Sequence, residues 1–105
     1  MKVYIGAHKE NRVMNVRIDK YDTWNLDHTL ALIILPALKQ FLKKLHGYPG
    51  DLSEKQWDDV LNKMIWSFEA ILMENEKDDI YTIEGNNRIQ EGLELFGKYY
   101  RSLWD

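Results

Sequence analysis

The side chains best suited to hold a ligand lie at residues 17–28, where a predicted strand gives way to a predicted helix. This segment contains Arg17, Tyr21, Trp24 and His28. The first turn of a helix has unpaired backbone N–H groups that attract anions such as phosphate. An arginine can hold a phosphate through two hydrogen bonds, and aromatic rings stack on bases. The structural alternative is that Asp22 caps the helix, Trp24 is buried, and Arg17 pairs with a nearby aspartate.

Cations and rings meet a second time near the C-terminus, on the last predicted helix. The candidate ligand-binding residues there are Lys98, Tyr99 and Arg101. Lys98 and Arg101 are three residues apart, so they are neighbours on a helix. The structural alternative is that the rings of this run are core residues and the cations offset the negative end of the helix dipole. We expect both clusters to surround one site for a phosphate-bearing nucleotide, within one subunit or between two.

The sequence gives little support for catalysis or for a bound metal. Its three histidines are scattered, it has no Cys, and no pair has metal-ligand spacing. It contains no G-x-S-x-G, no Walker loop and no G-x-G-x-x-G. We therefore expect a protein that is not an enzyme and that needs no cofactor. A small hydrolase is a third hypothesis, with His28 and Asp27 or Asp22 as acid and base.

Composition predicts one soluble domain, residues 1–105, in a reducing, intracellular compartment. The chain has 105 residues, which suffice for one core but not two. No basic-then-apolar leader and no long apolar run is present. The absence of Cys excludes disulfides. The net charge of −3 gives no reason to expect DNA, RNA or an anionic membrane as a partner.

The charges are unevenly distributed along the chain. Residues 1–50 hold 8 Lys and Arg against 4 Asp and Glu, a balance of +4. Residues 51–84 hold 3 against 10, a balance of −7, and residues 85–105 are balanced. This asymmetry indicates pairing between the two halves, within a subunit or between subunits. An anionic ligand would avoid the acidic middle segment.

A β-hairpin and three helices are the elements that must position these side chains. Residues 2–5 and 12–18 are β-branched or alternating runs on either side of a short polar loop, a pattern typical of a hairpin. A lone hairpin is not stable in water, so we expect helices to cover one of its faces. A second subunit adding strands to it is the alternative.

The first helix is predicted from about residue 25 to 45, with a kink near Pro36 because proline removes one backbone hydrogen bond. The second runs from about 54 to 75 behind a capping box made by Ser53 and Gln56. The third follows Gly85 and Asn86, and the run 80–83 is too short to assign, even as a third strand. The expected core residues are Ile33, Ile34, Trp57, Met64, Phe68, Leu93 and Phe96. The predicted class is α+β, an N-terminal antiparallel hairpin packed against three helices.

Two further features of the helices concern contacts. Residues 29–35 are apolar on nearly every side, which is typical of a helix buried all round. One hairpin and one helix cannot cover that much apolar surface, so we expect a homodimer or a larger homo-oligomer. Gly92 and Gly97 lie inside the third helix, where glycine is unfavourable by up to about 1 kcal/mol. Their presence predicts a close helix contact or a nearby ligand.

Three blocks of this sequence resemble a widespread family of small, uncharacterised tailed-bacteriophage proteins. The blocks are residues 21–40, 57–69 and 92–104. Small phage proteins without an enzyme motif are frequently counter-defence factors. The resemblance therefore implies a sponge protein of the anti-CBASS kind, which would bind a cyclic-nucleotide or NAD-derived immune signal in the host bacterial cytoplasm without cleaving it. The alternative is an interaction module that docks on a host or virion protein through the same aromatic residues.

Overall fold

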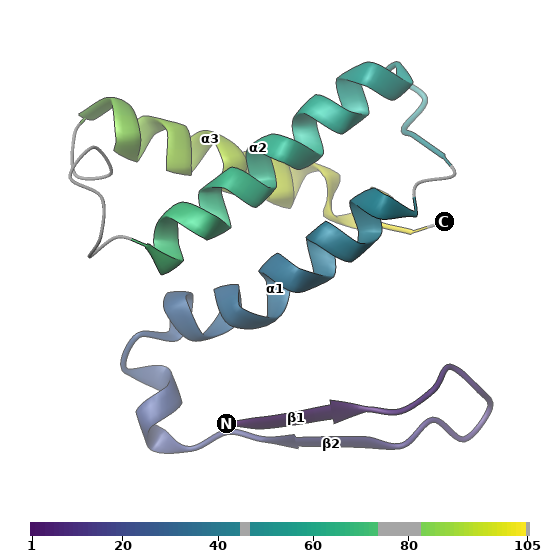
Figure 1. Cartoon of the computed structure of the whole chain (residues 1–105), viewed down its shortest axis with the longest axis vertical. Coiled ribbons are helices and arrows are strands. Elements are labelled where there is room, and N and C mark those ends of the chain that lie inside the picture. Colours follow the sequence, from purple (N-terminus) through teal and green to yellow (C-terminus); the bar gives the residue numbers. More distant parts are fainter. Residues whose placement is uncertain (45–46, 74–82, 105) are drawn as a thin grey trace.

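The computed structural model describes residues 1–44, 47–73 and 83–104, and it has the predicted α+β class. An N-terminal hairpin is followed by three helices (Figure 1). The elements are β1 (Lys2–Ile5), β2 (Met14–Arg17), the 3-10 helix η1 (Lys20–Thr23), α1 (Leu26–Lys43), α2 (Glu54–Leu72), α3 (Ile83–Tyr99) and the 3-10 turn η3 (Tyr100–Ser102).

The hairpin pairs β1 with β2 in an antiparallel register that separates apolar from polar residues. Val3 lies opposite Val16, and Ile5 lies opposite Met14. Residues directly opposite each other share a face of the sheet, and side chains alternate along each strand. One face is therefore wholly apolar. The other carries Lys2, Tyr4, Asn15 and Arg17.

Helix α2 is the centre of the core because it packs against both α1 and α3. Its first turn has the predicted capping box: the Ser53 hydroxyl accepts from the Gln56 N–H at 3.2 Å, and the Gln56 side chain accepts from the Ser53 N–H at 2.9 Å. The predicted core residues Trp57, Met64 and Phe68 are buried. Of the other four, Ile34, Leu93 and Phe96 are partly buried against this core, and Ile33 is exposed.

Helices α2 and α3 lie very close together at Gly92. A Cβ atom there would lie 2.5 Å from the Lys63 carbonyl oxygen and would overlap the Ser67 side chain. Ser67 is fully buried, and its hydroxyl donates to the Ile89 carbonyl at 3.0 Å. The close helix contact predicted for Gly92 is thus confirmed. Gly97, in contrast, has open space around its Cβ position.

Helix α1 differs from the prediction that it is buried all round. Only Ala31 and Leu38 are buried, and Leu30, Leu32 and Ile33 are exposed. The reason is that α1 packs against α2 along one side, while its opposite side has no comparable neighbour within the described residues. The helix also continues through Pro36 to Lys43 as one element, since a single lost backbone bond does not end it.

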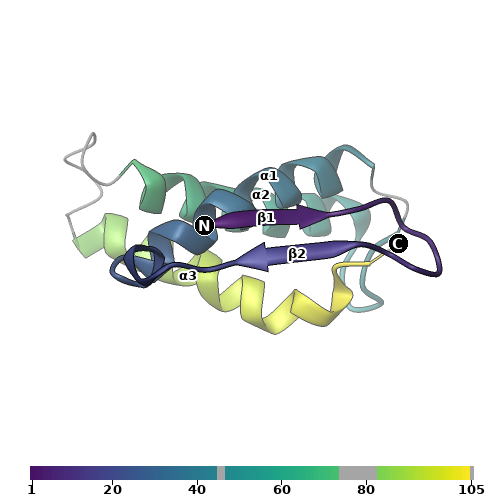
Figure 2. The ribbon, with the colours of Figure 1, turned by 90° about the horizontal axis from the view of Figure 1, so that it is seen from below.

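The hairpin lies apart from the bundle instead of being buried on it. Both strands are exposed along their whole length. Figure 1 places the hairpin on the far side of α1 from α2 and α3, joined to the helices through η1, and in Figure 2, seen from below, the hairpin lies in front of the helices. Ile83 belongs to α3. The rest of the unassigned run 80–83 and the predicted end of the second helix near residue 75 lie outside the described residues.

Candidate functional site

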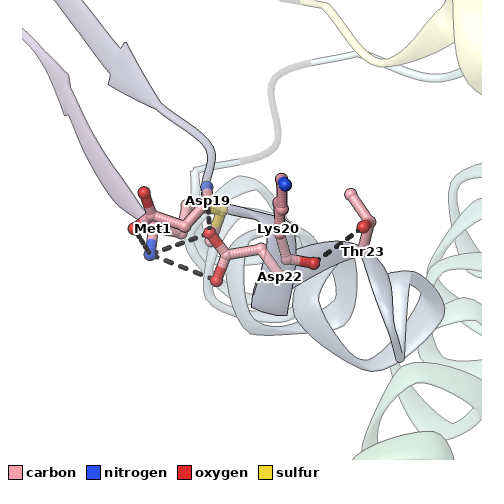
Figure 3. A network of polar contacts seen from close by, with 5 residues as sticks. All are labelled: Met1, Asp19, Lys20, Asp22 and Thr23. Atoms are coloured by element: carbon pink, nitrogen blue, oxygen red, sulfur yellow. Dashed lines mark hydrogen bonds and ion pairs between the residues drawn. The ribbon is translucent and has the colours of Figure 1, made fainter.

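We call residues 17–28 the elbow, because here the chain turns from β2 through η1 into α1. The carboxylate of Asp22 holds the elbow together (Figure 3). Its two oxygens lie 2.9 and 3.1 Å from the amino group of Met1, and one of them accepts from the Asp19 N–H at 2.7 Å. The Thr23 hydroxyl donates to the Lys20 carbonyl at 2.9 Å. These contacts fasten the start of β1 to η1 and fix where η1 presents its side chains.

Asp22 therefore does not cap α1, as the structural interpretation of the sequence had it, and it does not pair with Arg17. Asp22 lies in the 3-10 helix η1, which was not predicted. The turn of this helix brings the Asp22 carboxylate within hydrogen-bond distance of the Asp19 N–H. That hydrogen bond, and then the one from the Met1 amino group, lower the pKa of the Asp22 carboxyl. The hydrogen bond to Asp22 also raises the pKa of the Met1 amino group.

Tyr21 and Trp24 are the most prominent feature of the elbow. Their side chains are 78% and 82% exposed, and their ring centroids lie 6.1 Å apart at an interplanar angle of 71°. Trp24 is thus not a core residue. Two neighbouring rings with open faces are available to a ligand or a partner, and large exposed rings are typical of binding surfaces.

The two cations of the elbow, Arg17 and Lys20, form no ion pair with any side chain in the described parts of the chain. Arg17 ends β2 on the polar face of the hairpin, and its side chain has no partner among the residues that the structure describes. Lys20 lies one residue before Tyr21 and is exposed. His28 is half-buried in the first turn of α1, whose N-cap residue Asn25 makes no side-chain cap. The elbow thus offers two cations, two rings and an uncapped helix start. It also contains the carboxylates of Asp19, Asp22 and Asp27, of which Asp22 is paired with the Met1 amino group.

The C-terminal cluster has a different arrangement from the one expected. Tyr99 is only 7% exposed, its ring packs edge-on against Trp57 at 5.5 Å, and its hydroxyl donates to Asp51 at 3.3 Å. Tyr100 is the exposed ring, because α3 ends at Tyr99 and the chain continues as a 3-10 turn. Lys98 lies 5.2 Å from the Tyr99 ring centroid, and Arg101 is exposed. The two cations can contact a ligand, whereas the Tyr99 ring is a core group.

One chain does not bring the two clusters together. The elbow precedes α1, whose 18 residues span about 27 Å. The C-terminal half of α1, in contrast, lines a groove together with residues of α3 and η3. Figures 1 and 2 both show η1 and the C-terminal segment at opposite ends of the molecule. A site that uses both clusters therefore requires a second subunit.

Two hollows lie away from the elbow. The first, of about 410 Å³, is an apolar groove between α1 and the end of α3, with Phe41 and Phe96 on its walls. The second, of about 530 Å³, lies on α2 and α3, where the Arg88 guanidinium stacks 3.8 Å from the centre of the Trp66 ring. Two acidic residues, Asp59 and Glu69, and two basic residues, Lys63 and Arg88, line the second hollow, so its charges balance.

The pair of Trp66 and Arg88 was not predicted from the sequence. Trp66 falls outside the apolar stripe of α2, and a tryptophan in such a position is the signal that could have found it. No cluster of three or more His, Asp or Glu side chains that could hold a metal occurs in the parts of the chain that the structure describes. Within those parts, no helix is both long and apolar enough to cross a bilayer.

The chain matches no protein-family profile, no curated protein and no solved structure. The resemblance to tailed-bacteriophage proteins therefore stays a prediction.

Proposed function

We propose that this chain is a non-catalytic binding protein that holds a small phosphate-bearing nucleotide at the elbow. The observation that carries the proposal is the pair of open rings, Tyr21 and Trp24, beside the unpaired cations Arg17 and Lys20. Rings that stack on a base and cations that meet a phosphate are the two halves of nucleotide recognition. The biological role that fits is a phage sponge, which removes a cyclic-nucleotide or NAD-derived immune signal from the host cytoplasm.

Nanomolar affinity for a nucleotide requires more contacts than one elbow can supply. A stacked base contributes about 1–3 kcal/mol, and a hydrogen bond to a charged group about 1.5–3 kcal/mol. Nanomolar binding needs about 12 kcal/mol in net terms, after the loss of ligand freedom has been subtracted. An open surface with two rings falls short of this. We therefore infer that Lys98 and Arg101 of a second subunit complete the site.

Thermal-shift measurements with a panel of cyclic dinucleotides, cyclic trinucleotides and an NAD-derived cyclic nucleotide test this proposal. One of them should raise the melting temperature of the parent protein and of Lys55→Ala, which removes an exposed cation on α2 outside both clusters. The same compound should have a much smaller effect on Trp24→Ala and Arg17→Ala. Chromatography of the released ligand should recover it intact, because binding without turnover is proposed.

A second candidate function is docking on a host or virion protein. The observation that favours it is again the exposure of Tyr21 and Trp24, since Trp and Tyr are the residue types most common in interface hot spots. The two proposals differ in what Arg17 does. If a protein is the ligand, no nucleotide shifts the melting temperature, and Trp24→Ala weakens capture of the partner while Arg17→Ala has a smaller effect.

A further inference from the structure

The apolar face of the hairpin is the largest feature of this chain that the proposed function does not use. Val3, Ile5, Met14 and Val16 form that face, and they are 38% to 71% exposed. An isolated two-stranded hairpin is at best marginally stable in water. A regular alternation of apolar and polar residues, with the apolar side uncovered, therefore indicates that another surface covers it.

Helix α1 has a matching uncovered stripe. Leu26, Leu30 and Ile33 are exposed at the spacing of one helix face. The stripe continues through Ala37 to Phe41 into the apolar groove of about 410 Å³, whose other wall comes from Phe96, Tyr100 and Leu103. The hairpin face and the α1 stripe both leave apolar side chains uncovered, and exposed apolar patches on soluble proteins mark sites of contact with another surface.

The total surface area points the same way. The chain exposes 8281 Å², whereas a folded monomer of 12.5 kDa is expected to expose about 6,200 Å². Its radius of gyration is 15.5 Å, against about 13 Å for a compact chain of this length. The excess of about 2,000 Å² belongs to the whole chain, and two copies need to bury only about half of it each to reach the size of an obligate dimer interface.

We propose that a second copy of this chain covers the hairpin face and the α1 stripe. A twofold arrangement lets each copy place its hairpin on the α1 surface of the other, so the same patch is used twice. This inference stands on the apolar surface alone and does not rest on nucleotide binding.

Light scattering after size-exclusion chromatography tests the inference with two neighbouring substitutions in β2. The parent protein should have at least twice the 12.5 kDa mass of one chain at micromolar concentration. Val16→Lys, on the apolar face, should reduce the mass to that of one chain. Asn15→Lys adds the same charge on the opposite face and should leave the mass unchanged. Ile5→Lys is the second variant on the apolar face.

Circular dichroism shows whether the helices survive dissociation, and Asn15→Lys is the control for a general effect of the added charge on folding. Loss of the larger mass in Val16→Lys and Ile5→Lys supports the inference whether or not helix is lost with it, provided that Asn15→Lys keeps both, because the hairpin contributes nothing to the core of a single chain. A monomeric parent protein, or oligomers that survive both apolar-face substitutions, would overturn it. A monomeric parent would leave a different protein as the occupant of this surface.

Discussion

Gly92 of α3 lies directly against Ser67 of α2, so closely that no Cβ atom fits between the two helices. The Ser67 hydroxyl uses this proximity to reach the carbonyls of Ile89 and Arg88 at 3.0 and 3.3 Å. The contact fixes how α3 crosses α2, and therefore where the C-terminal cations are presented.

Replacing Gly92 with Ala should destabilise the fold by about 1–3 kcal/mol, the usual effect of overpacking a core. The clash is with the Lys63 backbone and the buried Ser67 side chain, which have little room to move. The matched control is Gly97→Ala in the same helix, where the Cβ position is open. That change should stabilise the fold by up to about 1 kcal/mol through helix propensity. Urea denaturation of the two variants gives the comparison, and equal free energies of unfolding would contradict it.

Substitution of Tyr99 should lower the stability of the fold far more than substitution of Tyr100. Tyr99→Ala removes a buried ring and should destabilise the fold by about 3–5 kcal/mol, whereas Tyr99→Phe removes only the hydrogen bond to Asp51 and should cost about 1 kcal/mol. Tyr100→Ala should have a much smaller effect because its ring is largely exposed. Thermal unfolding of the three variants measures this order. A larger loss for Tyr100→Ala than for Tyr99→Ala would show that the helix ends differently.

The ion pair between Asp22 and the Met1 amino group should be fully formed only within a window of pH. The pKa of Asp22 is lowered from its ordinary value of 3.8, so its contribution is complete above that pH and is lost as the pH falls through the lowered value. The pKa of the Met1 amino group is raised from 8.0, so its contribution is complete below pH 8.0 and is lost as the pH rises through the raised value. The hydrogen-exchange rate of the Asp19 amide, followed by NMR and corrected for the intrinsic pH dependence of exchange, measures how far the Asp19 N–H is protected by its hydrogen bond to Asp22. Asp22→Asn should abolish the pH window, and a window that persists in this variant would exclude the ion pair as its cause.

Several elements of this fold could be predicted because their signals are local. The capping box at Ser53 and Gln56 lies within one turn, and the stripe from Trp57 to Phe68 is read directly from residue spacing. The hairpin likewise follows from two alternating runs and a loop. The burial predicted for α1 is not reached within one chain, because an apolar sequence predicts a buried helix without identifying the neighbours that cover it.

The candidate site could be predicted only in part, and for similar reasons. The elbow is one continuous segment, so its rings and cations were found together. The roles of Tyr99 and Tyr100 were exchanged. Tyr99 is the last residue of α3 and lies seven residues after Gly92, on the helix face that packs against α2, whereas Tyr100 begins the 3-10 turn and is exposed. The distance between the two clusters depends on the length and direction of α1, which residue types do not reveal.

Removal of either arginine should weaken nucleotide binding by about 1.5–3 kcal/mol, the usual loss for a hydrogen bond to a charged group. Arg17→Ala tests the elbow and Arg101→Ala tests the C-terminal cluster. Neither residue belongs to the core, so the fold should be unchanged. Isothermal titration of both variants, with Lys55→Ala as control, measures the loss. If Arg101→Ala binds as the parent does, the C-terminal cluster is not part of the site.

Equilibrium dialysis of the parent protein against the same cyclic nucleotides tests the central claim most directly. The account predicts that one of them is retained at a fixed ratio to protein, that it is recovered chemically intact, and that Trp24→Ala fails to retain it while Tyr48→Ala, which removes an exposed ring outside the elbow, still does. Retention of none of these nucleotides, or recovery of a cleaved product, would contradict the account.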